Sequence, residues 1–321
     1  MALVRSVLDL IGDTPLVDVS QLSPRPGVRI LVKLEGQNPG GSVKDRIALA
    51  MVTEAEASGR LRPGQTILEP SSGNTGIGLA LVCRLKGYRL RIVLPENVSV
   101  ERRQLLEIFG AEIVSSPAEE GSNGAVRMAQ RLAGEAATGG DDTGGDDIAF
   151  LYQYGNPANP DAHYRGTGPE IWRDCPEVTH FVSGLGTSGT LMGVGRYLKE
   201  RNPDVRIWAV EPPAGELVSG LRNLDDGFVP EVFDPDVLDR KLIVRPRESI
   251  EWTRRLTAEA AIFAGISSGA AMAGAAKAAS ELDEGVIVTV LADGGWKYLS
   301  TGAWTDPIDE VVERASRIVY F

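Results

Sequence analysis

A lysine with the surroundings of a reactive amine lies in the segment Asn38-Pro39-Gly40-Gly41-Ser42-Val43-Lys44-Asp45-Arg46. The two glycines permit a tight turn, Ser42 is a candidate helix N-cap, and Asp45 follows as in a capping box. Lys44 would then lie in the first helical turn, where the helix dipole opposes its charge by about 0.3–1 kcal/mol. A destabilised ammonium loses its proton more readily and can form a Schiff base. The alternative is a surface lysine with no such role.

Two turns rich in glycine and hydroxyl groups each stand between an expected strand and an expected helix. The first is Glu69-Pro70-Ser71-Ser72-Gly73-Asn74-Thr75-Gly76, whose hydroxyls, amide and free N–H groups could bind a carboxylate. The second is Ser183-Gly184-Leu185-Gly186-Thr187-Ser188-Gly189-Thr190, which predicts a phosphate cradle because glycines let the backbone approach an oxyanion. The second turn has neither the lysine of a Walker motif nor a clean G-x-G-x-x-G pattern. Either turn, taken alone, could also be an ordinary connection.

A fourth segment, Gly265-Ile266-Ser267-Ser268-Gly269-Ala270-Ala271, contains a serine that could face the nitrogen of a heterocycle or could cap a helix. The two histidines, His163 and His180, have no obvious nucleophilic partner in the sequence, which also contains no Gly-x-Ser-x-Gly elbow. We therefore expect both histidines to be structural.

These segments must be positioned by strands and helices that alternate from residue 28 to about residue 295. The alternation predicts parallel sheets with crossover helices, and unbroken β-branched runs such as 286–290 are typical of strands buried on both faces. We expect strands at 28–32, 66–68, 90–94, 112–114, 148–151, 179–182, 206–210 and 286–291. We expect helices, among others, at 76–86, 101–109 and 125–136.

Length and composition limit the function. A chain of 321 residues is long enough for roughly two domains. Acidic residues outnumber basic ones by 44 to 33, and the net charge of −11 argues against nucleic acid or an anionic membrane as partner. Two cysteines and two histidines cannot form a zinc cage of the usual spacing, so we expect no metal site. Two cysteines in so long a chain indicate reduced thiols and a cytoplasmic location.

Three other segments bear on location and organisation. Residues 1–6 show no basic region followed by an apolar stretch, so no signal peptide is expected. Residues 260–276 carry no charge but are rich in alanine and glycine, which favours a buried turn and helix over a membrane span. Residues 138–147 consist of threonine, glycine and aspartate and are expected to form a surface loop near a domain boundary.

Taken together, the four segments resemble signatures of the cysteine synthase family, in that family's order. Residues 153–160, Gln-Tyr-Gly-Asn-Pro-Ala-Asn-Pro, and 298–302, Tyr-Leu-Ser-Thr-Gly, resemble further signatures. The resemblance extends from Ile11 to about residue 303. Because this family belongs to the fold-type-II pyridoxal phosphate enzymes, the resemblance implies an α/β fold of two open parallel-sheet domains. Pyridoxal 5'-phosphate would lie between them, near the carboxyl ends of the strands.

We expect a smaller N-terminal α/β domain at 35–152 and a larger cofactor-binding α/β domain at 13–34 plus 153–305. A C-terminal helix and apolar tail would occupy 306–321. The resemblance also implies a homodimer. The apolar residues 317–321 could cover the active-site cleft, pack on a subunit interface or pack on their own domain.

Residue by residue, the resemblance implies roles around the cofactor. Lys44 would hold pyridoxal phosphate as an internal aldimine and serve as general base, Asn74 would bond the phenolic ring oxygen, and Ser267 would face the pyridine nitrogen. The cofactor phosphate would be held by Gly186, Thr187, Ser188, Gly189 and Thr190. The substrate carboxylate would be bound by Ser71, Ser72, Thr75 and Gln153. Ser71 replaces the commoner threonine of the family and Ser188 a frequent glycine, which brings the second turn closer to the B-type branch.

The implied reaction is a β-replacement, in which a serine ester loses its β-substituent, an α-aminoacrylate remains, and a sulfur nucleophile adds to give L-cysteine. A neutral serine at the pyridine nitrogen would favour elimination over transamination. Residues 221–228, Leu-Arg-Asn-Leu-Asp-Asp-Gly-Phe, and 293–298 resemble the actinobacterial O-phosphoserine sulfhydrylases, also called cysteine synthase B. In that branch an arginine at the position of Arg222 recognises the substrate phosphate, which a guanidinium can bind bidentately. The alternative is a loop arginine paired with Asp225 or Asp226.

Other reactions of this fold type stay open. The substrate could be O-acetylserine, as for O-acetylserine sulfhydrylases, or an amine could replace sulfur, as in diaminopropionate synthesis. Serine or threonine dehydration is a further possibility. A pyridoxal-phosphate-binding regulator without turnover is a different class of protein, and the retained Lys44, Asn74 and Ser267 argue against it. The sulfur donor could be sulfide, thiosulfate or a thiocarboxylated carrier protein.

Overall fold

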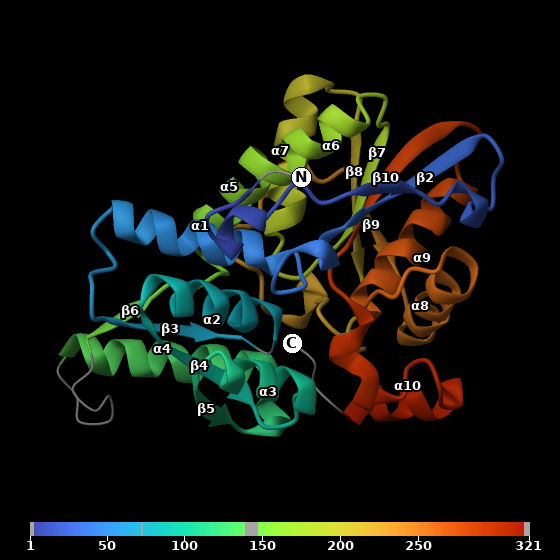
Figure 1. The fold of residues 1–321 in the computed structure, drawn as a ribbon. Helices are drawn as coiled ribbons and strands as arrows, with labels where there is room; N and C mark the ends of the chain where they lie inside the picture. Colours follow the sequence, from blue (N-terminus) through green and yellow to red (C-terminus); the bar gives the residue numbers. More distant parts are fainter. Residues whose placement is uncertain (1–2, 72, 139–146, 318–321) are drawn as a thin grey trace.

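Two mostly parallel β-sheets with helices on both faces form the core of the protein. The computed structural model describes residues 3–71, 73–138 and 147–317 (Figure 1). The six-stranded sheet has the order β1-β2-β10-β7-β8-β9 and the four-stranded sheet the order β5-β4-β3-β6. Only the β1–β2 pair is antiparallel among the strand pairs of the described chain. The α/β fold with parallel sheets, expected from the alternation of strands and helices, and the two sheets implied by the family resemblance are confirmed.

The strands are β1 (Leu16–Asp18), β2 (Val28–Leu34), β3 (Thr66–Pro70), β4 (Arg89–Pro95), β5 (Glu112–Ser116), β6 (Ile148–Phe150), β7 (His180–Gly184), β8 (Arg206–Glu211), β9 (Arg240–Ile243) and β10 (Gly285–Leu291). Every expected strand is present within a few residues. The short strands β1 and β9 were not expected. β1 spans three residues, and β9 is largely exposed and begins with Arg240 and Lys241, so neither carries an apolar run.

Helices cover both faces of each sheet, as the buried side chains of successive strand residues show. In the small sheet, Ile67 and Ile92 pack with the α1 and α2 helices, whereas Leu68 and Val93 pack with α4 (Figure 1). In the large sheet, the α8 and α9 helices lie on one face and α6 and α7 on the other. The α-helices are α1 (Lys44–Ala57), α2 (Asn74–Lys86), α3 (Val100–Ile108), α4 (Gly121–Thr138), α5 (Ala158–Ala162), α6 (Gly168–Asp174), α7 (Gly189–Arg201), α8 (Pro246–Ala260), α9 (Ile266–Ser280) and α10 (Ile308–Arg317).

The expected helices at 76–86, 101–109 and 125–136 correspond to α2, α3 and α4. The uncharged segment 260–276 is a turn followed by the buried helix α9, as expected. In the part of the chain that the structure describes, no helix is both long enough and apolar enough to cross a membrane. The glycine- and aspartate-rich segment falls mostly on residues 139–146, and the end of the apolar tail on 318–321, both outside the described residues.

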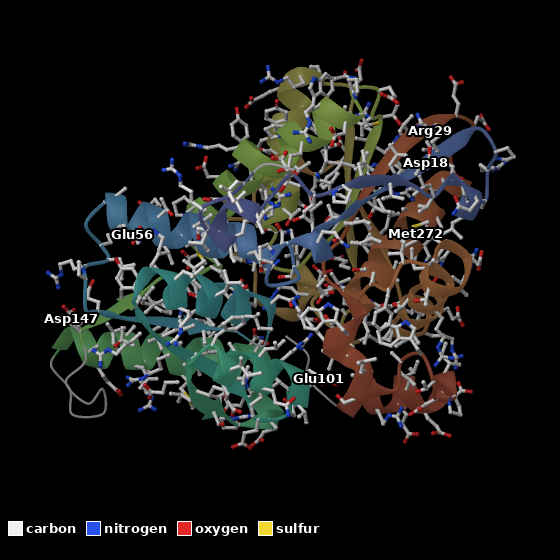
Figure 2. All side chains as sticks on the ribbon, viewed as in Figure 1. Asp18, Arg29, Glu56, Glu101, Asp147 and Met272 are labelled. Carbon is white, nitrogen blue, oxygen red and sulfur yellow. The ribbon has the colours of Figure 1, made fainter. Side chains whose placement is uncertain are left out.

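A contact between α3 and the 3-10 helix η9 (Gly295–Thr301) joins the small-sheet side to the large-sheet side. The Glu101 carboxylate accepts hydrogen bonds from the backbone N–H and the hydroxyl of Ser300, both at 2.8 Å. Figure 2 shows Glu101 at the edge of α3 that faces the C-terminal part of the chain. Nearby, Ser99 donates a hydrogen bond to the carbonyl oxygen of Lys297 at 3.2 Å. The expected division at 35–152 stays a proposal, but these contacts cross it.

Candidate active site

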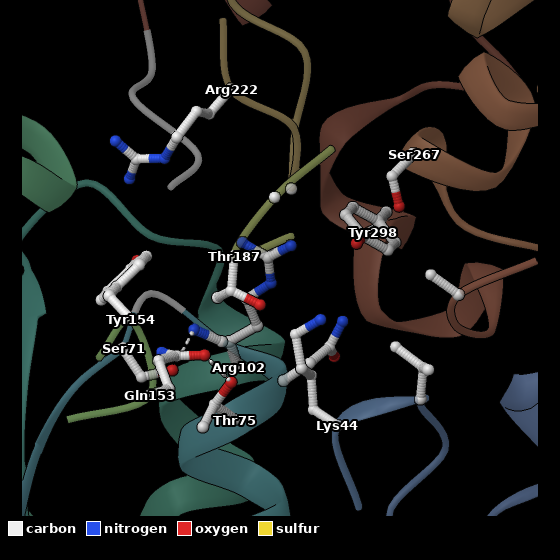
Figure 3. Close-up of a pocket in the computed structure, with 16 residues that line it drawn as sticks. Lys44, Ser71, Thr75, Arg102, Gln153, Tyr154, Thr187, Arg222, Ser267 and Tyr298 are labelled. Carbon is white, nitrogen blue, oxygen red and sulfur yellow. Dashed lines mark hydrogen bonds between the residues drawn. The ribbon is translucent and has the colours of Figure 1, made fainter. Parts of the chain in front are cut away.

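A cavity at the carboxyl ends of the strands collects side chains from distant parts of the sequence. It lies where the start of α1, the β3–α2 turn, the β7–α7 turn and the start of α9 converge (Figure 3). The expected site residues that line it are Lys44, Ser71, Asn74, Thr75, Gln153, Gly186, Thr187, Arg222 and Ser267. Ser188, Gly189 and Thr190 follow the wall residues and begin α7, and Ser72 lies outside the described residues.

Lys44 is the first residue of α1, in agreement with the expectation that it lies in the first helical turn. Desolvation lowers the pKa of its amine to about 8, although the charges of Asp293 and Glu35 oppose this effect. The expected cap is wrong, because Val43 and not Ser42 is the N-cap of α1. Ser42 is drawn into a β-bridge with Asp293, and its hydroxyl oxygen accepts a hydrogen bond from the Lys44 N–H at 3.2 Å.

The expected capping box is also absent at this helix. The carboxylate of Asp45 turns back to the glycine turn, where it accepts a hydrogen bond from the Gly40 N–H at 2.5 Å. Its other oxygen lies 3.5 Å from the Ser42 hydroxyl. Asp45 therefore stabilises the loop that delivers Lys44 to the cavity instead of capping the helix.

The turn between β3 and α2 is built around hydroxyl groups. The Ser71 hydroxyl oxygen accepts hydrogen bonds from the N–H groups of Gly73 and Gly76, at 3.3 and 2.9 Å. Thr75 donates its hydroxyl proton to Gln153 Oε1 at 2.7 Å, and Gln153 Nε2 donates to the carbonyl oxygen of Pro70 at 3.2 Å. Polar groups at the start of a long buried helix form a suitable environment for a carboxylate.

The turn between β7 and α7 fits a phosphate group. Gly186 and Thr187 line the cavity, and a Cβ atom on Gly186 would lie 2.9 Å from the carbonyl oxygen of Gly220. Ser188 caps α7 with a φ of 67°, a left-handed conformation that favours glycine. Its hydroxyl is buried without a hydrogen-bond partner among the described residues. An unpartnered buried hydroxyl at the start of a helix of 13 residues suits an anionic oxygen.

Thr190 is half-buried, and its hydroxyl is 3.2 Å from Nε2 of the buried His163. Nδ1 of His163 is 2.9 Å from the Thr167 hydroxyl. Burial, with the nearby charges of Arg46 and Lys44, holds the pKa of His163 well below its ordinary value. The imidazole is therefore neutral.

Ser267 is the second residue of α9, and the N-cap is Gly265. The alternative that Ser267 merely caps the helix is therefore wrong. Its side chain lies in the wall of the cavity, as Figure 3 shows. This position allows the hydroxyl to meet a ligand.

Arg222 lies at another side of the cavity (Figure 3), and its guanidinium contacts two aromatic rings. Its guanidinium carbon is 4.2 Å from the ring centroid of Phe228 and 5.3 Å from that of Tyr154. Nη1 also donates a long hydrogen bond of 3.4 Å to Asn123 Oδ1. The Asp226 carboxylate accepts a hydrogen bond from the Gly215 N–H at 3.0 Å, and the pairing of Arg222 with Asp225 or Asp226 stays an alternative.

Three large side chains of the cavity wall were not predicted as site residues. Arg102 of α3 lines the cavity, donates to the Ser219 hydroxyl at 3.3 Å and lies 4.8 Å above the Tyr298 ring. Tyr154 and Tyr298 complete the wall. Tyr154 and Tyr298 stand within segments that carried the resemblance, which was the one signal for them. Arg102 gave none, because an arginine on a helix is ordinarily solvated.

The donor set fits pyridoxal phosphate. It offers an amine with a lowered pKa, an amide beside it, a hydroxyl at the start of α9, and a glycine-rich turn with an unpartnered hydroxyl. These groups match an aldehyde, a phenolic oxygen, a ring nitrogen and a phosphate in turn.

Comparison with known proteins gives matches over nearly the whole chain. Residues 7–293 match a family described as pyridoxal-phosphate dependent enzyme. Cysteine synthase B of Pseudomonas aeruginosa is 42% identical over 303 residues, which cover 94% of this chain and 98% of the relative. A cysteine synthase of Staphylococcus aureus is 43% identical over 308 residues, covering 93% and 96%.

Solved structures agree with these matches. O-ureido-L-serine synthase superposes with a TM-score of 0.86 at 40% identity, covering 94% of this chain and 96% of that one. Cysteine synthase (OASS) of Entamoeba histolytica gives a TM-score of 0.86 at 33% identity, covering 98% and 96%.

Proposed function

Because this chain belongs to the cysteine synthase family of pyridoxal-phosphate-dependent enzymes, we propose that it makes L-cysteine from O-phospho-L-serine and a sulfur donor. Family membership makes it a cysteine synthase-type transferase with pyridoxal phosphate as cofactor. The choice of O-phosphoserine and the roles of individual residues are the proposal.

The cofactor would be held at four points. Lys44 would bind its aldehyde, Asn74 its phenolic oxygen and Ser267 its ring nitrogen, and the 186–190 turn would bind its phosphate. When bound, pyridoxal phosphate supplies an electron sink that makes the Cα–H of an amino acid acidic. Lys44 Nζ then takes the proton from Cα, a task for which a pKa of about 8 is suitable near neutral pH. The Ser267 hydroxyl is neutral, so it does not keep the ring nitrogen protonated as a carboxylate would.

The substrate carboxylate would lie against the β3–α2 turn. Ser71 and Thr75 offer hydroxyls there, and Gln153 is fixed by its hydrogen bonds to Thr75 and Pro70. Glu69, which is buried beneath this turn, accepts a hydrogen bond from the Gln153 N–H at 3.0 Å. Burial raises the pKa of Glu69 to about 8, despite hydrogen bonds from Gln153 and Tyr152 that lower it. A protonated Glu69 adds no charge to repel a carboxylate.

The position of Arg222 is the single observation that carries the choice of substrate. Arg222 lines the same cavity as Lys44, and its guanidinium contacts the rings of Phe228 and Tyr154, which pack edge-to-face on each other. A guanidinium binds phosphate bidentately, and its contacts with the two rings limit its motion, so less freedom is lost on binding. An acetyl ester has no anionic group for this arginine to bind.

The experiment compares R222A with the unchanged enzyme on two substrates. We expect kcat/KM for O-phosphoserine to fall by a factor that corresponds to roughly 2–5 kcal/mol of lost transition-state stabilisation. The value of kcat/KM for O-acetylserine should change little, because only O-phosphoserine loses an ionic contact with the arginine. R247A, which removes an exposed arginine on α8 outside the cavity, is the matched control and should behave as the unchanged enzyme. Equal losses on both esters would refute the proposal, provided that cofactor content is unchanged.

O-Acetylserine is the second candidate substrate, since the structure of a cysteine synthase (OASS) superposes closely on this chain. The same comparison of kcat/KM decides between the two esters. Sulfide is the sulfur donor in the simplest form of the proposal, and thiosulfate or a thiocarboxylated carrier protein are alternatives. We also propose a homodimer in the cytoplasm. The two free thiols support the reducing compartment.

A further inference from the structure

Two buried charged residues hold the side-chain amide of Asn74 from behind the cavity wall. Lys297 Nζ lies 2.7 Å from Asn74 Oδ1, and Asp293 Oδ2 lies 2.8 Å from Asn74 Nδ2. Lys297 is fully buried and Asp293 is 1% exposed. Neither is among the residues that line the cavity, whereas Asn74 is. Lys297 therefore contacts the cavity wall through Asn74, and Asp293 contacts it through Asn74 and Tyr298.

The chemistry of these partners fixes the orientation of the amide. An ammonium group has donors and no acceptor, and an ionised carboxylate has acceptors and no donor. The amide oxygen must therefore face Lys297 and the amide nitrogen must face Asp293, since the reverse orientation would bring like groups together. One hydrogen of Nδ2 is used by Asp293. The second remains for a ligand in the cavity.

Further contacts hold the two charged groups in place. Lys297 Nζ also donates to the carbonyl oxygen of Gly41 at 3.1 Å, and Asp293 Oδ2 accepts from the Tyr298 hydroxyl at 2.8 Å. The backbone carbonyl of Asp293 accepts from the Gly265 N–H at 3.0 Å. The contacts of Lys297 and Asp293 thus connect four segments, which are the loop before Lys44, the start of α2, the start of α9 and η9.

We propose that Lys297 and Asp293 are positioning residues that direct the free Nδ2 hydrogen of Asn74 toward the phenolic oxygen of pyridoxal phosphate. This inference rests on the proposed role of Asn74 at the cofactor, and it is independent of which serine ester the enzyme uses. Burial lowers the pKa of Lys297 to about 8, while Asp293 and Asp45 favour the charged form, so the ammonium remains a donor at neutral pH. The electron distribution of the cofactor depends on this hydrogen bond, and the visible spectrum reports it.

The test measures the visible absorption maximum and the dissociation constant of pyridoxal phosphate for four variants of the holoenzyme. They are K297M, N74A, the double variant of both, and K33M. Lys33 of β2 is also fully buried but is bonded to Glu170, so K33M controls for the loss of a buried ammonium. No substrate is added, so a wrong choice of serine ester cannot affect the result.

We expect K297M to shift the absorption maximum and to weaken cofactor binding about 10-fold, as the loss of a charged hydrogen bond would. In the N74A background, K297M should change the dissociation constant by less than about two-fold, because Lys297 acts through Asn74. K33M should lower the unfolding temperature without moving the absorption maximum. If K297M does not fold, K297Q takes its place with the same outcomes. An unchanged maximum in K297M, or equal effects of K297M with and without Asn74, would overturn the proposal.

Discussion

Lys44 and Lys297 illustrate how the surroundings of an amine decide its use. Burial lowers the pKa of both amines to about 8. Lys297 Nζ has two oxygen acceptors within 3.1 Å, whereas no hydrogen bond joins Lys44 Nζ to any residue that the structure describes. A lone pair is useful as a nucleophile or base only where it faces a ligand. The same chemical group is therefore left available to a ligand at the start of α1 and is held by two acceptors in η9.

The lowered pKa of Lys44 predicts how the cofactor-free protein takes up pyridoxal phosphate. The neutral amine is the nucleophile, so the rate of covalent attachment should rise with pH and level off above about pH 8, whereas an ordinary lysine would level off near 10.4. The visible absorbance after addition of pyridoxal phosphate follows this rate at a series of pH values. K44A should bind the cofactor without forming the covalent bond. A rate that still rises ten-fold per pH unit at about pH 9 would contradict the lowered pKa.

The residues that the sequence predicted have recognisable patterns. Either glycine- and hydroxyl-rich turn, taken alone, could have been an ordinary connection, so the turns that contain Ser71 and Thr187 were identified by the resemblance of all four segments together. Arg102 was not, because its stacking on Tyr298 joins two helices that are far apart in the chain. The cap at Ser42 was predicted wrongly, because a β-bridge to a residue some 250 positions away outweighed the local capping preference.

Among the elements, α3 has an unusual position. It is one of the helices around the small sheet, yet Ser99, Glu101 and Arg102 all contact residues of η9 or the loop before it. Ser99 and Glu101 lie within one helical turn of Arg102, which lines the cavity. The alternation of strands and helices predicted α3 but could not show its contact with η9, since that contact depends on how the two sheets are arranged. Because Arg102 of α3 and Tyr298 of η9 both line the cavity, a change in the relative position of the two sheets would also change the shape of the cavity.

The variant E101A tests this contact. Removing both hydrogen bonds to Ser300 should lower the free energy of unfolding by about 1–2 kcal/mol, because the Ser300 N–H loses its partner. E107A, at an exposed position of the same helix, should change it by less than about 0.5 kcal/mol. Urea unfolding of the two variants gives both values. Equal stabilities would show that the contact contributes nothing to folding.

For the molecule as a whole, a buried network of charges ties the start of the large sheet to α1 and α6. Lys33 Nζ and Arg46 Nη1 each lie 2.7 Å from an oxygen of Glu170, and Arg46 Nε lies 2.7 Å from Glu35 Oε2. Burial by itself raises the pKa of Glu170, but Arg46 and Lys33 outweigh it and bring the pKa to about 2. A sequence with a net charge of −11 gives no sign of which charges are buried.

Glu170 should make the protein sensitive to acid in a defined range. Its pKa is lower in the folded chain than the ordinary 4.5, so its stabilising effect is complete above pH 4.5 and is lost as the pH falls toward 2. The loss is about 3 kcal/mol in the free energy of unfolding. Urea unfolding at a series of pH values should show it. The slope should be clearly smaller in E170Q and reduced much less in E259Q, whose carboxylate is in an exposed pair with Arg255 that lowers its pKa only in a solvated setting.

Both cysteine thiols of the chain are out of reach of reagents in solution. Cys83 and Cys175 are free and are 2% and 0% exposed, and burial raises the pKa of Cys83 to about 12 and that of Cys175 to about 11. Disulfide exchange and alkylation require an accessible thiolate. A colorimetric thiol reagent present during turnover would therefore react with the released amino acid and spare the catalyst. An enzyme that produces thiols continuously thus avoids exchange of its own thiols with the disulfide that oxidation of its product would give.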